Sequence, residues 1–201
     1  MLFSDTYLTI EKPAEIIFKD KGSKFLTYIY PAQNDQQIKD ILNQLRKEHH
    51  TANHHCYAYR LGADKQNYRA NDDGEPNNTA GKPILGQIQS ADLTDVLIVV
   101  VRYFGGTLLG VSGLINAYKT SAAEVIKAVT IIEKQILFHY TIHFPFEQLN
   151  DVMKLLKQLD AKISNQQFDN DCSIQFSIRK ANSEACEEKL KKMNGLRLEY
   201  N

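Results

Sequence analysis

The stretch from Leu97 to Ala117 constrains the fold of this chain more than any other. Residues 96–101 read VLIVVV, and such a continuously apolar, largely β-branched run is typical of a strand covered on both faces. Glycines follow at positions 105, 106, 110 and 113. Glycine costs backbone entropy on folding, so a cluster of them indicates positive φ angles or a close backbone approach. We predict a buried strand, a tight loop and a long apolar helix over about 109–129.

Two interpretations of the glycine loop stand at this point. A strand–loop–helix unit with glycines at the helix start can present free N–H groups to an anion. Alternatively, the glycines only permit a tight turn. The loop matches neither the G-x-G-x-x-G pattern nor the phosphate-binding G-x-x-x-x-G-K-[ST] pattern, so neither nucleotide-binding motif is indicated.

Composition places the chain among soluble globular proteins. It has 201 residues, 43% hydrophobic and 24% charged, with a formal net charge of zero, which argues against strong non-specific attraction to nucleic acid or to an anionic membrane. No apolar run approaches the ~20 residues of a membrane span, and we expect no signal peptide. The cysteines are few and widely spaced, which predicts free thiols in a reducing cytoplasm. They are Cys56, Cys172 and Cys186.

The first part of the chain alternates strand and helix patterns. Strands are expected at 7–10, 15–19, 25–30 and 54–61. Asn34 reads as a helix cap with Gln37 at the third helical position, opening an amphipathic helix that ends near His49 and His50. Residues 62–90 are polar and turn-rich, with a short helix expected from Pro83. In the strand over 54–61, Cys56 should face one side of the sheet and Tyr57 the other.

The pattern restarts after about residue 130. We expect a strand over 136–144, a helix from Pro145 or Phe146, strands over 161–168 and 172–178 joined by a hairpin at 169–171, a helix capped by Asn182 or Ser183, and a strand over 196–200. This βαββαβ order is the ferredoxin-like split unit. We therefore predict an α+β protein with two domains, 1–132 and 133–201.

Four ordered motifs give the chain a family resemblance. They are KGSKF at 21–25, HHCYAYR at 54–60, NDDGEP with TAGKP over 71–83, and RYFGG running to GL and AY over 102–118. On these residues the chain resembles the IMPACT/YigZ family along its full length. The resemblance implies a first domain with the fold of the second domain of ribosomal protein S5. It also implies a ferredoxin-like second domain similar to domain V of elongation factor G.

The resemblance also implies a functional setting. Eukaryotic members of the family resemble regulators of translation that compete for a co-activator of the kinase sensing uncharged tRNA. The two-domain bacterial type, which this chain resembles more, has no agreed activity. The resemblance therefore favours an association with translation.

This chain departs from the family pattern at three positions. Asn78 stands where a glycine is usual, and because asparagine tolerates positive φ we expect the turn to survive. Ser112 replaces the first glycine of a pair. Asn116 replaces an arginine, which removes a cation from the helix beside the glycine loop and weakens a phosphate-contact role there.

We predict one binding surface for phosphate or nucleic acid around the glycine loop. Arginine can fork onto a phosphate, and an aromatic ring can stack on a base. In the competing interpretation Tyr103 and Phe104 are core residues, and Arg102 pairs with Asp73 or Glu75. The predicted surface comprises Arg60, Arg69, Lys82, Arg102, Tyr103, Phe104, Gly105, Gly106, Gly110, Gly113 and Lys119. Lys21 and Lys24 in the hairpin turn either extend its rim or are merely solvated.

An acidic loop accompanies this surface, formed by Asp72, Asp73, Glu75 and Thr79. Its carboxylates suit a divalent cation, but acidic turns more often cap backbone N–H groups. The histidines at 49, 50, 54 and 55 with Cys56 fit no zinc template, because a second close ligand pair is missing. A Cys56–His nucleophilic pair competes with a merely buried thiol. We predict no metal, no cofactor and no catalytic residue.

The sequence thus favours a non-enzymatic, cytoplasmic binding protein whose partner is RNA, the ribosome or a translation-regulatory protein. It would bind through the surface from Arg102 to Gly113. One alternative is a nucleotide- or phosphate-binding enzyme that uses the glycine loop with Asp72, Asp73 or Glu75. Another is a protein–protein adaptor, and the oligomeric state is left open.

Overall fold

The computed structural model describes residues 5–168 and 171–200. The chain divides into two compact units, one formed by Tyr7–Lys134 and the other by Gln135 onwards with the segment before Tyr7. Both units mix helices and strands. Among the described residues, no helix combines the length and apolarity needed to cross a membrane.

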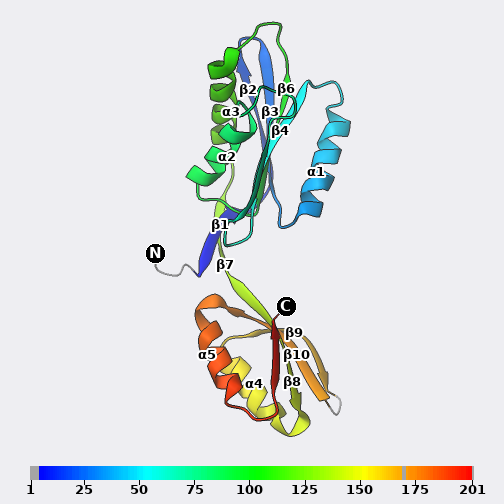
Figure 1. Ribbon diagram of the computed structural model, residues 1–201, viewed down its shortest axis with the longest axis vertical. Coiled ribbons are helices and arrows are strands. Elements are labelled where there is room, and N and C mark those ends of the chain that lie inside the picture. Colours follow the sequence, from blue (N-terminus) through cyan, green and yellow to red (C-terminus); the bar gives the residue numbers. More distant parts are fainter. Residues whose placement is uncertain (1–4, 169–170, 201) are drawn as a thin grey trace. The chain divides into compact units, whose positions relative to one another are not determined.

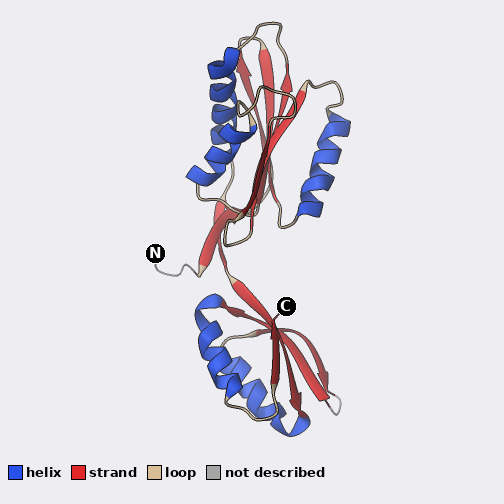
Figure 2. Ribbon diagram, in the orientation of Figure 1, coloured by secondary structure: helices blue, strands red, loops and turns tan. Residues whose placement is uncertain are grey.

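The first unit is a five-stranded antiparallel sheet covered by helices on both faces, with strand order β2-β3-β6-β4-β5. Helix α1 lies on one face, and α2 and α3 lie on the other (Figures 1 and 2). A separate pair, β1 and β7, completes the unit. The elements are β1 (Thr6–Ile10), β2 (Ala14–Asp20), β3 (Ser23–Pro31), α1 (Asp35–Glu48), β4 (His54–Leu61), β5 (Asn67–Asn71), α2 (Gly81–Ser90), β6 (Val96–Tyr103), α3 (Gly110–Lys127) and β7 (Ile131–Gln135).

Strand β6 is the centre of this sheet, as its sequence predicts. Residues 96–101 are each 0% exposed, because helices cover both faces. Val96, Ile98 and Val100 pack in the core beneath α2 and α3. The alternate residues 97, 99 and 101 pack beneath α1. The same alternation places Cys56 of β4 in the first core and Tyr57 in the second, which confirms the predicted faces of that strand.

The predicted start of α1 is also confirmed. The Asn34 Oδ1 accepts a hydrogen bond from the Gln37 backbone N–H at 2.9 Å. The Gln37 side chain in turn accepts the N–H of Gln33 at 2.8 Å. These bonds satisfy N–H groups that a helix start leaves free, so the cap fixes where α1 begins.

Two strands were not predicted, and both lack a clear apolar signal. Strand β5 lies inside the expected loop, and four of its five residues are exposed because it is an edge strand paired only with β4. Strand β7 pairs with β1 rather than joining the main sheet. Helix α2 begins at Gly81, before the expected Pro83.

The second unit follows the βαββαβ order expected from the sequence. Its four strands form an antiparallel sheet in the order β11-β8-β10-β9, and both helices lie on one face (Figure 1). Ser183 does not cap the last helix: it is buried and its hydroxyl donates to the Lys180 carbonyl, because α5 starts earlier than predicted. The expected hairpin at 169–171 falls mostly outside the described residues. The elements are β8 (Leu137–Pro145), a 3-10 turn η1 (Phe146–Gln148), α4 (Leu149–Gln158), β9 (Lys162–Phe168), β10 (Asp171–Arg179), α5 (Lys180–Lys191) and β11 (Arg197–Tyr200).

A backbone contact holds the start of the glycine loop against the β2–β3 turn. A methyl group added at Gly105 would lie 1.9 Å from the carbonyl carbon of Gly22. Gly22 itself has a φ of +81°. Only glycine fits at Gly105, because its neighbour is backbone that has no rotamer with which to move aside.

We predict that Gly105→Ala destabilises the fold by about 2 kcal/mol or more, because the two chain segments must separate. Gly86→Ala is the matched control, since Gly86 lies within α2 and an added methyl group meets nothing within 4 Å. That change should stabilise the fold by about 0.5–1 kcal/mol. Urea unfolding measures both, and equal effects would show that the Gly22–Gly105 contact carries no constraint.

Candidate functional site

A buried ion pair lies at the end of β6. Arg102 is only 5% exposed. Its Nη1 lies 2.7 Å from Oε1 of Glu75, which is also buried. Its Nη2 donates to Ser23 Oγ at 3.3 Å, and the same hydroxyl accepts the Gly105 N–H. The interpretation in which Arg102 pairs with an acid is therefore correct.

Two further polar groups extend this pair into the core. The Tyr118 hydroxyl of α3 donates to Glu75 Oε1 at 2.7 Å. The Cys56 thiol lies 3.3 Å from that hydroxyl and 3.0 Å from the Asp72 carbonyl, so its single proton is within reach of two acceptors. Burial raises the pKa of the Cys56 thiol, and it raises the pKa of Tyr118 as well. Both groups stay protonated, so Cys56 is a buried donor and not an activated nucleophile.

The acidic loop is built around the start of α2. The Asp72 carboxylate accepts the N–H groups of Asn78, Ala80 and Gly81 at 2.8, 3.0 and 2.8 Å. Ala80, the residue before the helix, provides no side-chain cap. Asp72, which is remote in sequence but in direct contact, caps the helix start instead. Asn78 has a φ of +65°, which confirms that asparagine takes the left-handed conformation there.

The other members of the acidic loop are also engaged within the chain. Asp73 accepts the His55 N–H at 2.6 Å and forms an ion pair with Arg46 at 3.5 Å. The Thr79 hydroxyl donates to the Pro76 carbonyl at 2.6 Å. Across residues 5–168 and 171–200, no group of three His, Cys, Asp or Glu side chains is arranged to hold a metal ion. The loop carboxylates stabilise the loop itself.

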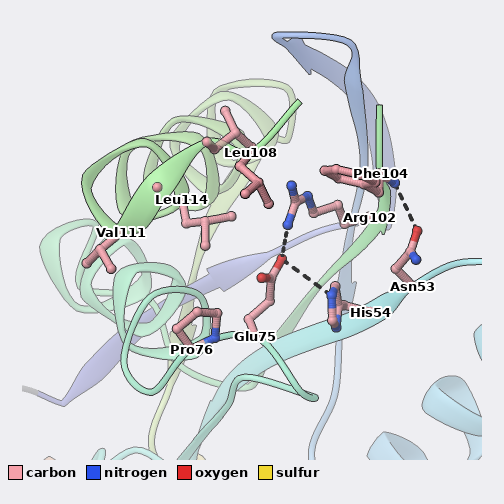
Figure 3. A pocket seen from close by; sticks show the side chains of 11 residues that line it. Asn53, His54, Glu75, Pro76, Arg102, Phe104, Leu108, Val111 and Leu114 are labelled. Atoms are coloured by element: carbon pink, nitrogen blue, oxygen red, sulfur yellow. Dashed lines mark hydrogen bonds and ion pairs between the residues drawn. The ribbon is translucent and has the colours of Figure 1, made fainter. Parts of the chain in front are cut away.

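A pocket of about 440 Å³ opens beside the ion pair. Figure 3 shows Arg102, Glu75 and His54 pointing toward one another, with leucine and valine side chains of the glycine loop and α3 nearby. His54 Nε2 lies 3.9 Å from Glu75 Oε1. The pocket is thus largely apolar and carries a paired charge. Its lining comprises Asn53, His54, Glu75, Pro76, Arg102, Phe104, Leu108, Leu109, Gly110, Val111 and Leu114.

The predicted surface is only partly assembled. Arg102, Phe104 and Gly110 line the pocket, but Arg60 does not join them. Arg60 pairs with Val96 at the other end of β4, whereas Arg102 pairs with His54. Arg60 is buried, and its Nε donates to the Leu93 carbonyl at 2.6 Å. The expected convergence of Arg60 on this rim is therefore wrong, because β4 runs its full length between them.

The remaining residues of the predicted surface are spread over both faces of the sheet and over several elements. Tyr103 faces α1, and its hydroxyl is hydrogen-bonded to His49 Nδ1 at 3.0 Å, so it lies on the opposite face of the sheet from Arg102. Gly106 and Gly110 take φ values of +86° and +74°. Gly113 packs closely against the Leu109 side chain. Arg69 on β5, Lys82 on α2 and Lys119 on α3 are all exposed.

Sequence reasoning missed the apolar part of the pocket. Leu108 is 84% exposed and Val111 is 61% exposed. The sequence does hold one signal, because Leu108 follows the glycine pair outside the predicted helix, where no strand or helix pattern assigns it to the core. Its neighbour Leu109 is buried in the core.

Known proteins match this architecture. The model of the Impact N-terminal domain matches residues 21–126, which include the whole pocket. The chain belongs to the IMPACT family. It is 36% identical over 166 residues to IMPACT family member YigZ of Escherichia coli, covering 82% of this chain and 81% of that protein.

Two further similarities bear on the IMPACT assignment. Protein IMPACT of Xenopus laevis is 41% identical over 96 residues, 45% of this chain and 30% of that protein. A solved structure described as the crystal structure of a hypothetical protein superposes with a TM-score of 0.76 at 32% identity, covering 98% of this chain and 97% of that one. The likeness to that structure therefore extends over both units.

We predict that Glu75→Leu destabilises the protein by about 3–5 kcal/mol, because it leaves the Arg102 guanidinium buried without its counter-charge. The double change Glu75→Leu with Arg102→Met should recover most of that loss, since no unpaired charge remains. Denaturant unfolding of the wild type, both single variants and the double variant gives the coupling free energy. Additive losses would show that the two side chains are not energetically paired.

We predict that Cys56 resists thiol reagents in the folded protein, because it is buried and its pKa is raised. Ellman's reagent at pH 8 should modify no cysteine on the timescale of minutes, and all three cysteines after denaturation. A Cys56→Ser variant identifies the site if one thiol does react. Rapid modification of Cys56 in the native state would revive the nucleophile hypothesis.

Proposed function

We propose that this IMPACT family protein is a non-enzymatic binding protein that associates with the translation apparatus through the Arg102–Gly113 surface. The observation that carries the proposal is the apolar pocket at that surface. Leu108 and Phe104 stand exposed at its mouth, at 84% and 45%. Exposed apolar groups around a pocket are typical of a protein–protein contact. The link to translation rests on the family resemblance.

The charges at the site support a protein partner over RNA. An RNA-binding surface needs free cations for the phosphates. Here the Arg102 charge is matched by Glu75 at 2.7 Å, and the chain has no net charge. Lys82 and Lys119 are exposed, and we propose them as a polar rim around the contact. Arg69 is exposed too, but it pairs with Tyr59, next to Arg60 and at the far end of β4 from the pocket, so we leave it out of this rim.

The same contacts speak against the enzyme alternative. Asp72 accepts three backbone N–H groups, and Asp73 and Glu75 are each ion-paired. A metal- or nucleotide-dependent enzyme would need these oxygens for its ligand. We therefore propose no catalytic residue, and we propose a cytoplasmic location on the grounds of the free cysteines.

We also propose finer fold assignments. The domain over 1–132 would have the fold of the second domain of ribosomal protein S5. The domain over 133–201 would be ferredoxin-like, similar to domain V of elongation factor G. The βαββαβ order and the strand order β11-β8-β10-β9 support the second assignment.

The test is co-sedimentation of the purified protein with the ribosomes and factors of a reconstituted bacterial translation system at moderate salt. We expect saturable association that Leu108→Asp reduces about ten-fold, because a charge replaces the exposed apolar contact. Ile17→Asp is the matched control, since Ile17 is also exposed, at 57%, but lies on β2 away from the pocket. No association, or equal loss in both variants, would overturn the proposed function.

A further inference from the structure

We infer that the pocket beside Arg102 receives the C-terminal residue of a protein partner. The terminal apolar side chain would lie against the pocket wall, and the terminal carboxylate would lie at the start of α3. This inference rests on the proposed function, because it specifies the chemistry of the partner. Three features of the pocket carry it.

The first feature is the uncapped start of α3. This helix has 18 residues, and Leu109 before it supplies no side-chain hydrogen bond to the first turn. Gly110 and Val111, the first two residues of the helix, line the pocket. The first N–H groups of a helix have no partner within the helix, and the helix dipole favours a negative charge there. A carboxylate is therefore favoured at this end of the pocket.

The second feature is an unsatisfied donor on Arg102. Nη1 and Nη2 are hydrogen-bonded within the chain, whereas Nε is buried and has no hydrogen-bond partner among the described residues. Buried donors are nearly always paired, so a missing acceptor points to a ligand. The rings of Phe25 and Phe104 each lie 5.6 Å from the guanidinium carbon. Phe104 is the exposed one of the two rings, and it lines the pocket together with Arg102.

The third feature is the contrast between the wall and the charge beside it. Leu108, Val111 and Leu114 form the apolar wall (Figure 3). The volume of about 440 Å³ is within the usual range of ligand pockets, about 300–1,000 Å³. The Glu75 carboxylate also lines the pocket, and it would repel a phosphate group with two charges more than a single carboxylate.

These features fit an apolar group that bears one carboxylate. A protein C-terminus and a fatty acid share that chemistry. We commit to the protein C-terminus, because Leu108 and Phe104 extend the apolar surface beyond the pocket mouth. That surface gives the residues before the terminal one something to contact, whereas a fatty acid would leave it exposed.

The experiment uses four probes with the purified full-length protein. They are the N-acetylated tetrapeptide Ala-Ala-Ala-Leu with a free carboxylate, the same peptide as its C-terminal amide, the same peptide ending in serine, and octanoate. Backbone amide signals of Gly110 and Val111 are followed by NMR during titration. We expect saturable shifts with the leucine acid, and at least ten-fold weaker binding for the amide and for the serine acid.

Each other outcome overturns a stated part of the inference. Equal binding of acid and amide would rule out the carboxylate contact. Equal binding of the leucine and serine acids would rule out the apolar wall as the specificity element. Octanoate binding as tightly as the leucine acid would overturn the choice of a protein terminus, and no saturable shift with any probe would overturn the inference as a whole.

A matched pair of variants locates the binding. Leu108→Ser should weaken the leucine acid at least five-fold, whereas Ile17→Ser should leave it unchanged, because Ile17 does not line the pocket. Equal effects would overturn the location. The titration contains no ribosome, so peptide binding without co-sedimentation would sink the proposed function alone. Co-sedimentation without peptide binding would sink this inference alone.

Discussion

The ion pair between Arg102 and Glu75 is the contact on which the first unit most depends. Through it the central strand β6 is joined to the acidic loop, to Ser23 at the start of β3, and to Tyr118 of α3. These segments are far apart in the sequence and meet only when the sheet is complete. A buried charge without its partner costs several kcal/mol, so each segment holds the others in place. The shape of the pocket depends on the same ion pair, because Arg102 and Glu75 both line it.

Much of the fold follows from apolar patterning, and the exceptions have physical reasons. The buried strand β6 and the capped, amphipathic helix α1 can be predicted from the sequence, because burial and capping each require a local residue pattern. Strand β5 has no such pattern, since it is an exposed edge strand held by backbone hydrogen bonds to β4. In the second unit the alternating burial along β10 and the apolar stripe of α4 match the sequence patterns that predicted these two elements.

The sequence predicted where the candidate site lies, but left open whether its arginine is buried and paired with an acid within the chain. Whether Arg102 points to solvent or into the core depends on which strands flank β6. A single sequence does not show which strands pair with one another. Arg60 looked equivalent in the sequence, yet it lies at the far end of β4. The Asp72 carboxylate suited either a metal ion or the capping of backbone N–H groups, and its oxygens accept the N–H groups at the start of α2, which confirms the capping. In each case long-range pairing decided the role of a residue whose local context was ambiguous.

The internal hydrogen bonds of the acidic loop have a consequence for the speed of recognition. Since Asp72 and Thr79 already fix the loop, the rim of the pocket needs no folding step before it meets a partner. In the proposed complex, encounter would then be limited by diffusion and orientation, and the lifetime would be set by how fully the pocket is filled. The acidic loop would add little ordering cost, because its conformation is already fixed. Partners of this protein would then be discriminated chiefly by their dissociation rates.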